Sequence, residues 1–151
     1  MVRIHCYVSR WEFILARCRN KRVLHLGCIG ETEGTTADKI SAMISERVIH
    51  ALIRKRAGYV IGIDHDFSTV EALRRLGYEE IVYGDVTSLD NLGMSETFDV
   101  IVCGDLIEHL SNPGSMLDGI NSYLDKIRFD AIYGGFTGHT PAIYTGKSRF
   151  V

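Results

Sequence analysis

Four short apolar runs dominate the first two thirds of this chain, and each of them ends on a glycine or an acid. They span residues 23–30, 59–64, 81–85 and 98–105. Runs of this length and composition are typical of buried β-strands. In open parallel α/β sheets, ligands bind in the crevice outside the carboxyl ends of the strands. The pattern therefore predicts one polar edge with the shape of a nucleotide site.

Helical patterns separate these runs. A short helix is predicted over residues 11–19, and a second over 37–57, ending at Gly58. A third helix begins at Ser68, with Glu71 completing a capping box, and ends at Gly77. The alternation of strand and helix predicts a parallel sheet with right-handed crossovers. The apolar stripe expected on the long second helix comprises Ile40, Met43, Ile44, Val48, Ala51 and Leu52.

The end of the chain contains weaker patterns. Asn112 and Pro113 indicate the cap and first residue of a helix that runs to Leu124. A fifth strand is predicted within residues 127–133 and a further short strand within 142–145. We expect one α/β domain over residues 1–151, with a core at 11–125 and an irregular tail at 126–151. An uncovered sheet edge would favour association, so the tail or a second copy in a homodimer is expected to cover it.

Composition narrows the classes of partner. The chain has 151 residues, of which 46% are hydrophobic, and a formal net charge of −2. This balance favours a small-molecule partner over nucleic acid or an anionic membrane surface. The four cysteines form no C-x-x-C pair, which indicates neither a zinc site nor a disulfide framework, and Cys28 and Cys103 are expected as buried thiols. With no long apolar segment, the cytoplasm is the expected location.

The first predicted strand ends in a turn that contains glycines. The spacing Gly27-x-x-Gly30-x-x-x-Gly34 differs from the G-x-G-x-x-G of dinucleotide sites. A missing Cβ at Gly27 would let a ligand approach the backbone, although a plain tight turn accounts for the same residues. The turn carries no basic residue and no phosphate-binding G-x-x-x-x-G-K motif, so a ligand without phosphates is favoured.

Two acids follow the next two strands. Asp64 is placed where a carboxylate accepts hydrogen bonds from ribose hydroxyls, although it could instead cap the following helix. Asp85 could accept a hydrogen bond from an exocyclic amine while Val86 packs on a flat ring. The alternative for Asp85 is a turn aspartate that binds local backbone N–H groups. Together the two acids favour an adenosine-like ligand.

The ordered set of motifs resembles the class I S-adenosylmethionine-dependent methyltransferases. Residues 23–28, 62–64, 84–86, and 98–102 with 105–110 are similar to the four successive motifs of that family, and the resemblance covers residues 11–124. It implies a Rossmann-like three-layer sandwich with a mostly parallel sheet and abbreviated C-terminal strands, and S-adenosylmethionine as cofactor. It implies that the glycine turn contacts the methionine part, Asp64 the ribose and Asp85 the adenine. The cofactor-binding residues predicted in this way are His25, Gly27, Cys28, Gly30, Asp64, His65, Asp85 and Val86.

The chain departs from the family pattern at several positions. His25 stands where the first motif commonly has an acid, and Ile29 and Glu31 stand where it has further glycines. A histidine can still hydrogen-bond across the strand ends. The usual Pro-Gly-Gly turn before the fifth strand is missing after residues 123–124.

Asp105, Glu108 and His109 follow the fourth strand, where relatives place residues near the methyl acceptor. Methyl transfer is an in-line displacement that depends on positioning, and it needs a general base only if the acceptor must lose a proton. His109 is the candidate whose ordinary pKa suits that role. The same cluster could hold a divalent ion, as a similar one does in some O-methyltransferases, or could simply order the loop before Asn112.

The prediction is a methyltransferase that acts on an unidentified small molecule. The alternative is a non-catalytic or truncated remnant that retains the cofactor cleft. A nicotinamide-dependent oxidoreductase would need closer glycines and an acid about twenty residues later, and Asp64 lies farther along.

Overall fold

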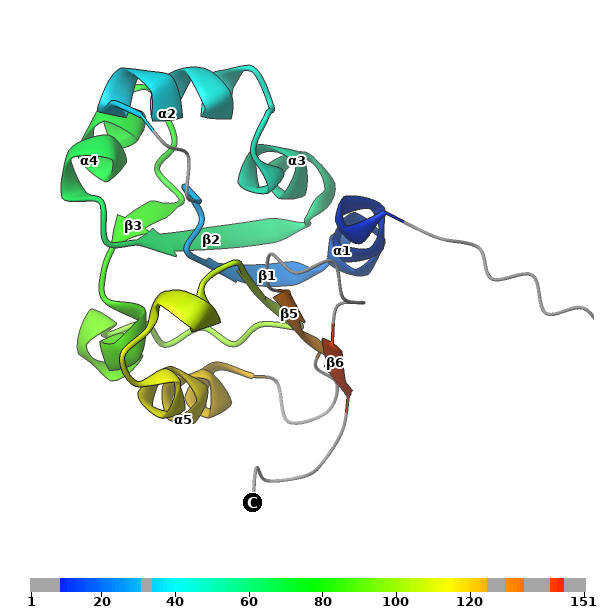
Figure 1. Cartoon of the computed structure of the whole chain (residues 1–151). Coiled ribbons are helices and arrows are strands. Elements are labelled where there is room, and N and C mark those ends of the chain that lie inside the picture. Colours follow the sequence, from blue (N-terminus) through cyan, green and yellow to red (C-terminus); the bar gives the residue numbers. More distant parts are fainter. Residues whose placement is uncertain (1–8, 31–33, 125–129, 135–141, 146–151) are drawn as a thin grey trace, which may run out of the picture.

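A mostly parallel sheet forms the centre of the molecule (Figure 1). The computed structural model describes residues 9–30, 34–124, 130–134 and 142–145. The strand order is β3-β2-β1-β4-β5-β6, and each neighbouring pair is parallel except β5 with β6. The strands are β1 Arg22–Leu26, β2 Tyr59–Asp64, β3 Ile81–Tyr83, β4 Val100–Gly104, β5 Asp130–Gly134 and β6 Ala142–Thr145.

The register brings the carboxyl ends of the central strands together. Leu26 on β1 pairs with Ile63 on β2 and with Cys103 on β4. The glycine turn and the acids that follow these strands are therefore gathered at one edge, as the sequence predicts. The α/β class is confirmed, and so are a fifth and a sixth strand, although residues 127–129 lie outside the described part of the chain.

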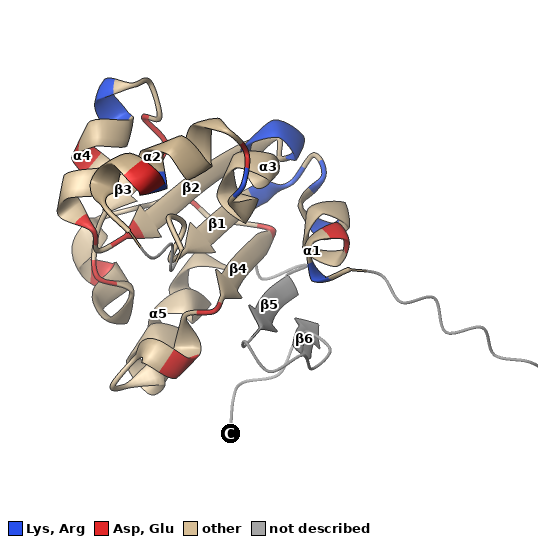
Figure 2. Cartoon of the chain, turned by 45° about the horizontal axis from the view of Figure 1, so that its top comes forward, with Lys and Arg blue, Asp and Glu red and all other residues tan. Residues whose placement is uncertain are grey.

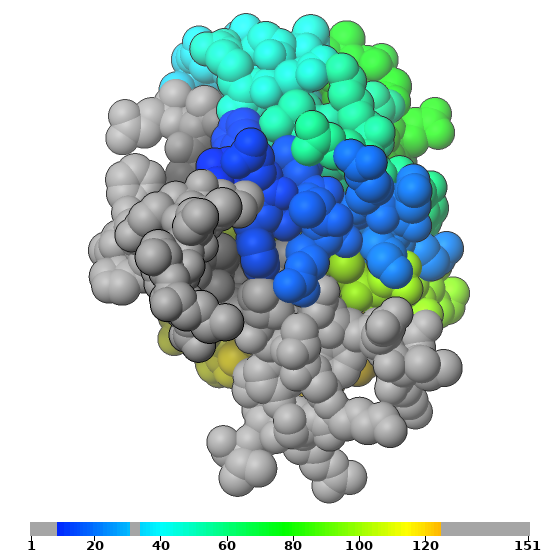
Figure 3. All heavy atoms as spheres, turned by 90° about the vertical axis from the view of Figure 1, so that its right-hand side faces the viewer, coloured from blue at the N-terminus to red at the C-terminus, as the bar shows by residue number. Residues whose placement is uncertain are grey.

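Helices cover both faces of the sheet (Figure 1). On one face, the apolar sides of α1 and α3 pack on β1, β2 and β4 through residues such as Ile14 and Ile53. On the same face, α4 packs on β3 and against α2 through Leu73. On the other face, α5 and the 3-10 segment η1 enclose Phe98, Met116 and Ile120. Figure 3 shows α1 and the turn that enters β1 lying beside α3. The helical elements are α1 Arg10–Cys18, α2 Thr36–Ile44, α3 Ile49–Arg56, α4 Phe67–Arg75, η1 Val86–Leu92, η2 Ile107–His109 and α5 Pro113–Tyr123.

The first crossover differs from the prediction of a single helix over 37–57. Two helices, α2 and α3, meet at a turn in which Glu46 adopts a left-handed φ of 59°. The backbone N–H of Arg47 donates to the carbonyl of Ala42 at 2.9 Å and closes this turn. The change of direction leaves Ile44, predicted in the apolar stripe, 57% exposed and turns His50 into the interior. Residues 45–47 in this turn are polar and exposed, so the turn can face solvent.

Helix caps decide the starts of the later helices. Asp66, rather than the predicted Ser68, caps α4, and its carboxylate accepts a hydrogen bond from the N–H of Thr69 at 3.1 Å. Asp66 takes the cap position because it lies directly after the turn from β2, where its carboxylate also forms an ion pair with Lys39. The predicted cap at Asn112 is confirmed, since its side chain accepts from the N–H of Ser115.

Tyr123 connects α5 to η1 through one buried hydrogen bond. Its hydroxyl donates to the carbonyl of Leu89 at 2.9 Å. We expect Tyr123→Phe to lower the free energy of unfolding by about 1–2 kcal/mol, because a buried carbonyl loses its partner. Urea denaturation measures this change. Exposed Tyr83→Phe is the matched control, and an equal loss in both variants would contradict the assignment.

Candidate functional site

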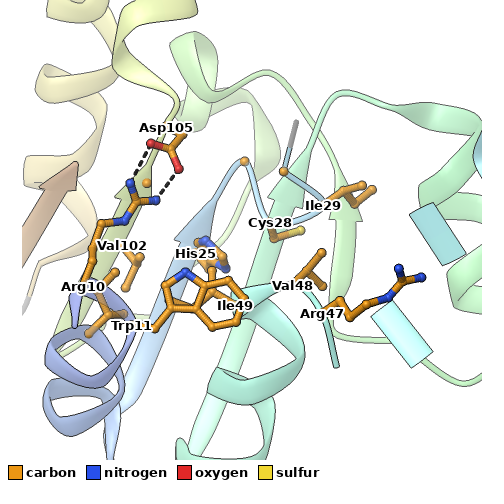
Figure 4. A pocket seen from close by; sticks show the side chains of 14 residues that line it. Arg10, Trp11, His25, Cys28, Ile29, Arg47, Val48, Ile49, Val102 and Asp105 are labelled. Atoms are coloured by element: carbon orange, nitrogen blue, oxygen red, sulfur yellow. Dashed lines mark hydrogen bonds and ion pairs between the residues drawn. The ribbon is translucent and has the colours of Figure 1, made fainter. Parts of the chain in front are cut away.

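A cavity of about 610 Å³ opens at the carboxyl ends of β1 and β4. It lies between α1, the glycine turn after β1 and the turn that joins α2 to α3 (Figure 4). The volume is within the range of small-molecule sites, which is about 300–1,000 Å³. The residues that line it are Arg10, Trp11, Ile14, His25, Gly27, Cys28, Ile29, Gly30, Arg47, Val48, Ile49, Val102, Gly104 and Asp105.

The glycine turn forms one wall of the cavity. Gly27 and Gly30 have φ values of 70° and 74°, a region that favours glycine. The N–H groups of Gly27 and Cys28 both donate to the carbonyl of Ile63, at 2.8 and 3.2 Å, and tie the turn to β2. A Cβ on Gly30 would meet no atom within 4 Å, so the backbone there borders open space. The turn thus presents bare backbone to the cavity.

Asp64 fixes the glycine turn through hydrogen bonds from backbone N–H groups to its carboxylate. Its buried carboxylate accepts hydrogen bonds from the N–H of Ile29 and from that of Asp66, both at 3.0 Å. It orders both loops that leave the central strands, a role that neither sequence interpretation included. The neighbouring His65 is exposed, and its Nδ1 lies 3.7 Å from Asp64 Oδ1. Neither residue lines the cavity.

Asp85 and Val86 lie farther along the same edge. Asp85 accepts hydrogen bonds from the N–H and the hydroxyl of Thr87, at 2.8 and 2.7 Å, and these bonds lower the pKa of its carboxyl. This is the turn geometry that the sequence left open as an alternative. Val86 is buried in the core beneath α5 instead of facing solvent. Both residues lie outside the cavity lining.

An ion pair closes the other end of the cavity. Both terminal nitrogens of Arg10, on α1, donate to the two carboxylate oxygens of Asp105, at the end of β4, with Nη1 at 2.8 Å from Oδ1 (Figure 4). These hydrogen bonds and the nearby Glu108 raise the pKa of Arg10. Asp105 holds a left-handed φ of 49°, a conformation that a non-glycine residue adopts at some cost.

The cavity brings together only part of the residues that the sequence predicted. His25, Gly27, Cys28, Gly30 and Asp105 line it, whereas Glu108 and His109 lie exposed on η2 outside the lining. Within the described part of the chain, no group of three His, Cys, Asp or Glu side chains could hold a metal ion. Sequence reasoning missed the residues of α1 and of the α2–α3 turn. The capping box of Ser9 and Glu12, which starts α1 at Arg10, was a detectable signal.

His25 makes a contact that sequence reasoning did not foresee. Its Nδ1 lies 3.1 Å from Nδ1 of His50 on α3, and the two rings stack with centroids 5.2 Å apart. Burial lowers the pKa of both imidazoles, that of His50 to about 4. Both rings are therefore neutral at neutral pH.

The thiols of Cys28 and Cys103 are buried, as predicted. Burial raises the pKa of Cys28 well above its ordinary value, which makes it a poor nucleophile at neutral pH. Cys28 therefore contributes to the cavity wall by packing.

Basic side chains gather away from the cavity, at the C-terminal end of α3 and the turn before β1 (Figure 2). Arg54, Lys55 and Arg56 are exposed there, as expected for a solvated surface, but Arg47 lies apart on the cavity rim. None of the helices in the described ranges is both long and apolar enough to span a bilayer.

The Arg10–Asp105 pair is expected to contribute little to stability. Both side chains are about 30% exposed, and such ion pairs contribute roughly 0–1 kcal/mol. We expect Arg10→Gln to change the free energy of unfolding by less than about 1 kcal/mol in urea denaturation. A loss above 3 kcal/mol would show instead that the pair holds α1 on the sheet.

Comparison with known proteins identifies the family. The model of the methyltransferase domain family matches residues 45–126, more than half of the chain. The chain belongs to the S-adenosylmethionine-dependent methyltransferases. The family predicted from the four motifs is thereby confirmed, and with it the Rossmann-like fold.

Individual relatives agree with this assignment. The chain is 30% identical over 114 residues to a ubiquinone biosynthesis O-methyltransferase of Hahella chejuensis, an alignment that covers 72% of this chain and 41% of that protein. The YcgJ protein of Bacillus subtilis has the same fold, with a TM-score of 0.52 and 17% identity, over 82% of this chain and 49% of that one. The plantazolicin methyltransferase BpumL, solved with S-adenosylhomocysteine (SAH), has a TM-score of 0.50 and 16% identity, over 82% and 43%. The chain thus spans less than half the length of each.

Proposed function

We propose that this chain binds S-adenosylmethionine along the carboxyl edge of its sheet and transfers the methyl group to a small molecule. The observation that supports this most directly is the cavity between the glycine turn and the Arg10–Asp105 pair. The left-handed Gly30, on which a Cβ would meet only open space, leaves room for a ligand against the backbone. The cofactor supplies an electrophilic methyl group on a sulfonium.

The charges of the cavity match an amino-acid tail. Two of the five guanidinium N–H donors of Arg10 are used by Asp105, which leaves three for a carboxylate. Asp105 retains lone pairs that an ammonium group can use. The methionine part of the cofactor would therefore lie at the Arg10–Asp105 end of the cavity. The adenosine part would extend toward Asp64 and Asp85 along the same edge.

The acceptor would enter beside the apolar wall of Trp11, Ile14 and Ile49. This wall favours an apolar or aromatic body on the acceptor. Positioning supplies most of the rate enhancement of an in-line displacement. His109 stays our candidate base, together with Glu108. Both lie on η2, directly after the segment that carries Asp105.

Binding of SAH, measured by isothermal titration calorimetry, tests the cofactor site. We expect Arg10→Gln to weaken binding about tenfold or more, because a charge-assisted hydrogen bond contributes about 1.5–3 kcal/mol. Arg56→Gln, on the exposed end of α3, is the control and should leave affinity unchanged. No measurable binding by the unaltered chain would refute the cofactor proposal.

Turnover separates the two functional hypotheses. Incubation with S-adenosylmethionine and a panel of phenols, amines and thiols should release SAH if the chain is an enzyme. Binding without product from any acceptor would favour the non-catalytic alternative.

A further inference from the structure

In residues 27–30, the part of the glycine turn that the structure describes before Gly34, every backbone N–H group already donates a hydrogen bond. The N–H groups of Gly27 and Cys28 donate to Ile63, that of Ile29 to Asp64, and that of Gly30 to the carbonyl of Gly27 at 3.1 Å. A ligand lying against residues 27–30 must therefore find its hydrogen-bond donor in a side chain. Among the described residues that form this wall, which are His25 on β1 and Gly27, Cys28, Ile29 and Gly30 in the turn, His25 has a side-chain nitrogen that can donate.

The contact with His50 decides which nitrogen of His25 carries the proton. A single proton lies between the two Nδ1 atoms, which are 3.1 Å apart, so one ring donates and the other accepts. Nε2 of His50 is buried and has no hydrogen-bond partner in the described structure. A proton there would leave an N–H donor buried without an acceptor, whereas a proton on Nε2 of His25 belongs to a ring that lines the cavity, where water or a ligand can accept from it. The first arrangement is therefore the costlier one.

The surroundings of His50 keep its ring neutral, with a single proton. Burial and the positive charge of Arg54, one turn further along α3, lower the pKa of His50. Arg54 itself forms an ion pair with Glu80, with Nε and Oε1 2.5 Å apart. His50 therefore carries its proton on Nδ1 and donates to Nδ1 of His25. His25 must then carry its own proton on Nε2.

We propose that His50 is a positioning residue that holds His25 in the Nε2–H form, so that His25 donates a hydrogen bond to the ligand carboxylate in the cavity. This inference rests on the proposed function, because it takes the methionine tail of the cofactor as the ligand of this cavity. His25 Nε2 has no other partner in the part of the chain that the structure describes, and the residue lines the cavity (Figure 4). His25 thus supplies a neutral hydrogen-bond donor at the position where the family's first motif commonly has an acid.

Two variants of His50 and two ligands test this role. His50→Leu removes the donor to His25, whereas His50→Asn keeps an amide N–H close to the position of Nδ1. SAH carries the amino-acid tail, and 5′-methylthioadenosine has the same nucleoside without it. We expect His50→Leu to bind SAH about tenfold more weakly by calorimetry, with affinity for methylthioadenosine changed less than about twofold. His50→Asn should restore most of the SAH affinity.

Equal weakening of both ligands, or of neither, would overturn the positioning role. Two-bond ¹H–¹⁵N spectra of the ligand-free protein give an independent readout and do not require any variant to fold. They should show His25 protonated at Nε2 and bare at Nδ1, and the opposite tautomer would overturn the inference. If the unaltered chain binds methylthioadenosine but not SAH, the carboxylate contact is wrong. If it binds neither ligand, the proposed function itself fails.

Discussion

Gly62→Ala is expected to lower the free energy of unfolding by about 1–3 kcal/mol, the range for overpacking a core. Gly62 lies in the middle of β2, and a Cβ there would come within 2.7 Å of both Cys28 Sγ and His50 Cε1. Both neighbours are buried and cannot simply swing into solvent. The missing side chain of Gly62 is therefore what allows the glycine turn and α3 to approach the sheet together.

The same substitution should also damage the site. Displacing Cys28 moves the turn that lines the cavity, and displacing His50 moves the partner of His25. We expect weaker SAH binding along with the lower midpoint of urea denaturation. Gly114→Ala is the control, because a Cβ in this exposed first turn of α5 would meet only the exposed side chain of Asn112, at 3.2 Å, and should cost less than about 1 kcal/mol. A Gly62→Ala variant as stable as the control would contradict the packing described for β2.

Acid should destabilise the protein through the buried histidine pair. Burial lowers the pKa of His50 to about 4 in the folded state, compared with about 6.5 in the unfolded chain. Between these values the unfolded chain binds a proton that the folded chain does not, so stability falls as the pH decreases. The slope is about 1.4 kcal/mol per pH unit for each such histidine, which for His50 amounts to on the order of 3 kcal/mol over this range.

Urea denaturation between pH 7.5 and 4.5 measures this effect. His50→Leu should reduce the slope by the share of one histidine, since His25 remains buried with a lowered pKa. Burial raises the pKa of the neighbouring Cys28 thiol well above its ordinary value, so this group does not titrate in the same window. Asp66 and Asp85 have lowered carboxyl pKa values and contribute below about pH 4. A flat profile from pH 6.5 to 4.5 would contradict neutral burial of the pair.

Local patterns were sufficient for most of the fold. Apolar runs that end near glycines or acids predicted where the strands lie along the chain, because a strand buried on both faces must be apolar throughout. The helix cap at Asn112 and the helix end at Gly77 could also be predicted, because both depend on neighbours a few residues away. The break between α2 and α3 was missed because the apolar spacing continues across it, and only packing on the sheet decides where the chain turns.

The sequence by itself determined the family and the edge of the sheet where the site lies, because motif order and strand ends are properties of the linear chain. Tertiary structure alone decided which residues meet in the cavity. It brought Arg10 to Asp105 across 95 positions and His25 to His50 across 25, and it directed the Asp64 carboxylate into the turn. Contacts between distant segments depend on how helices pack on the sheet, and no local pattern of residues specifies that packing.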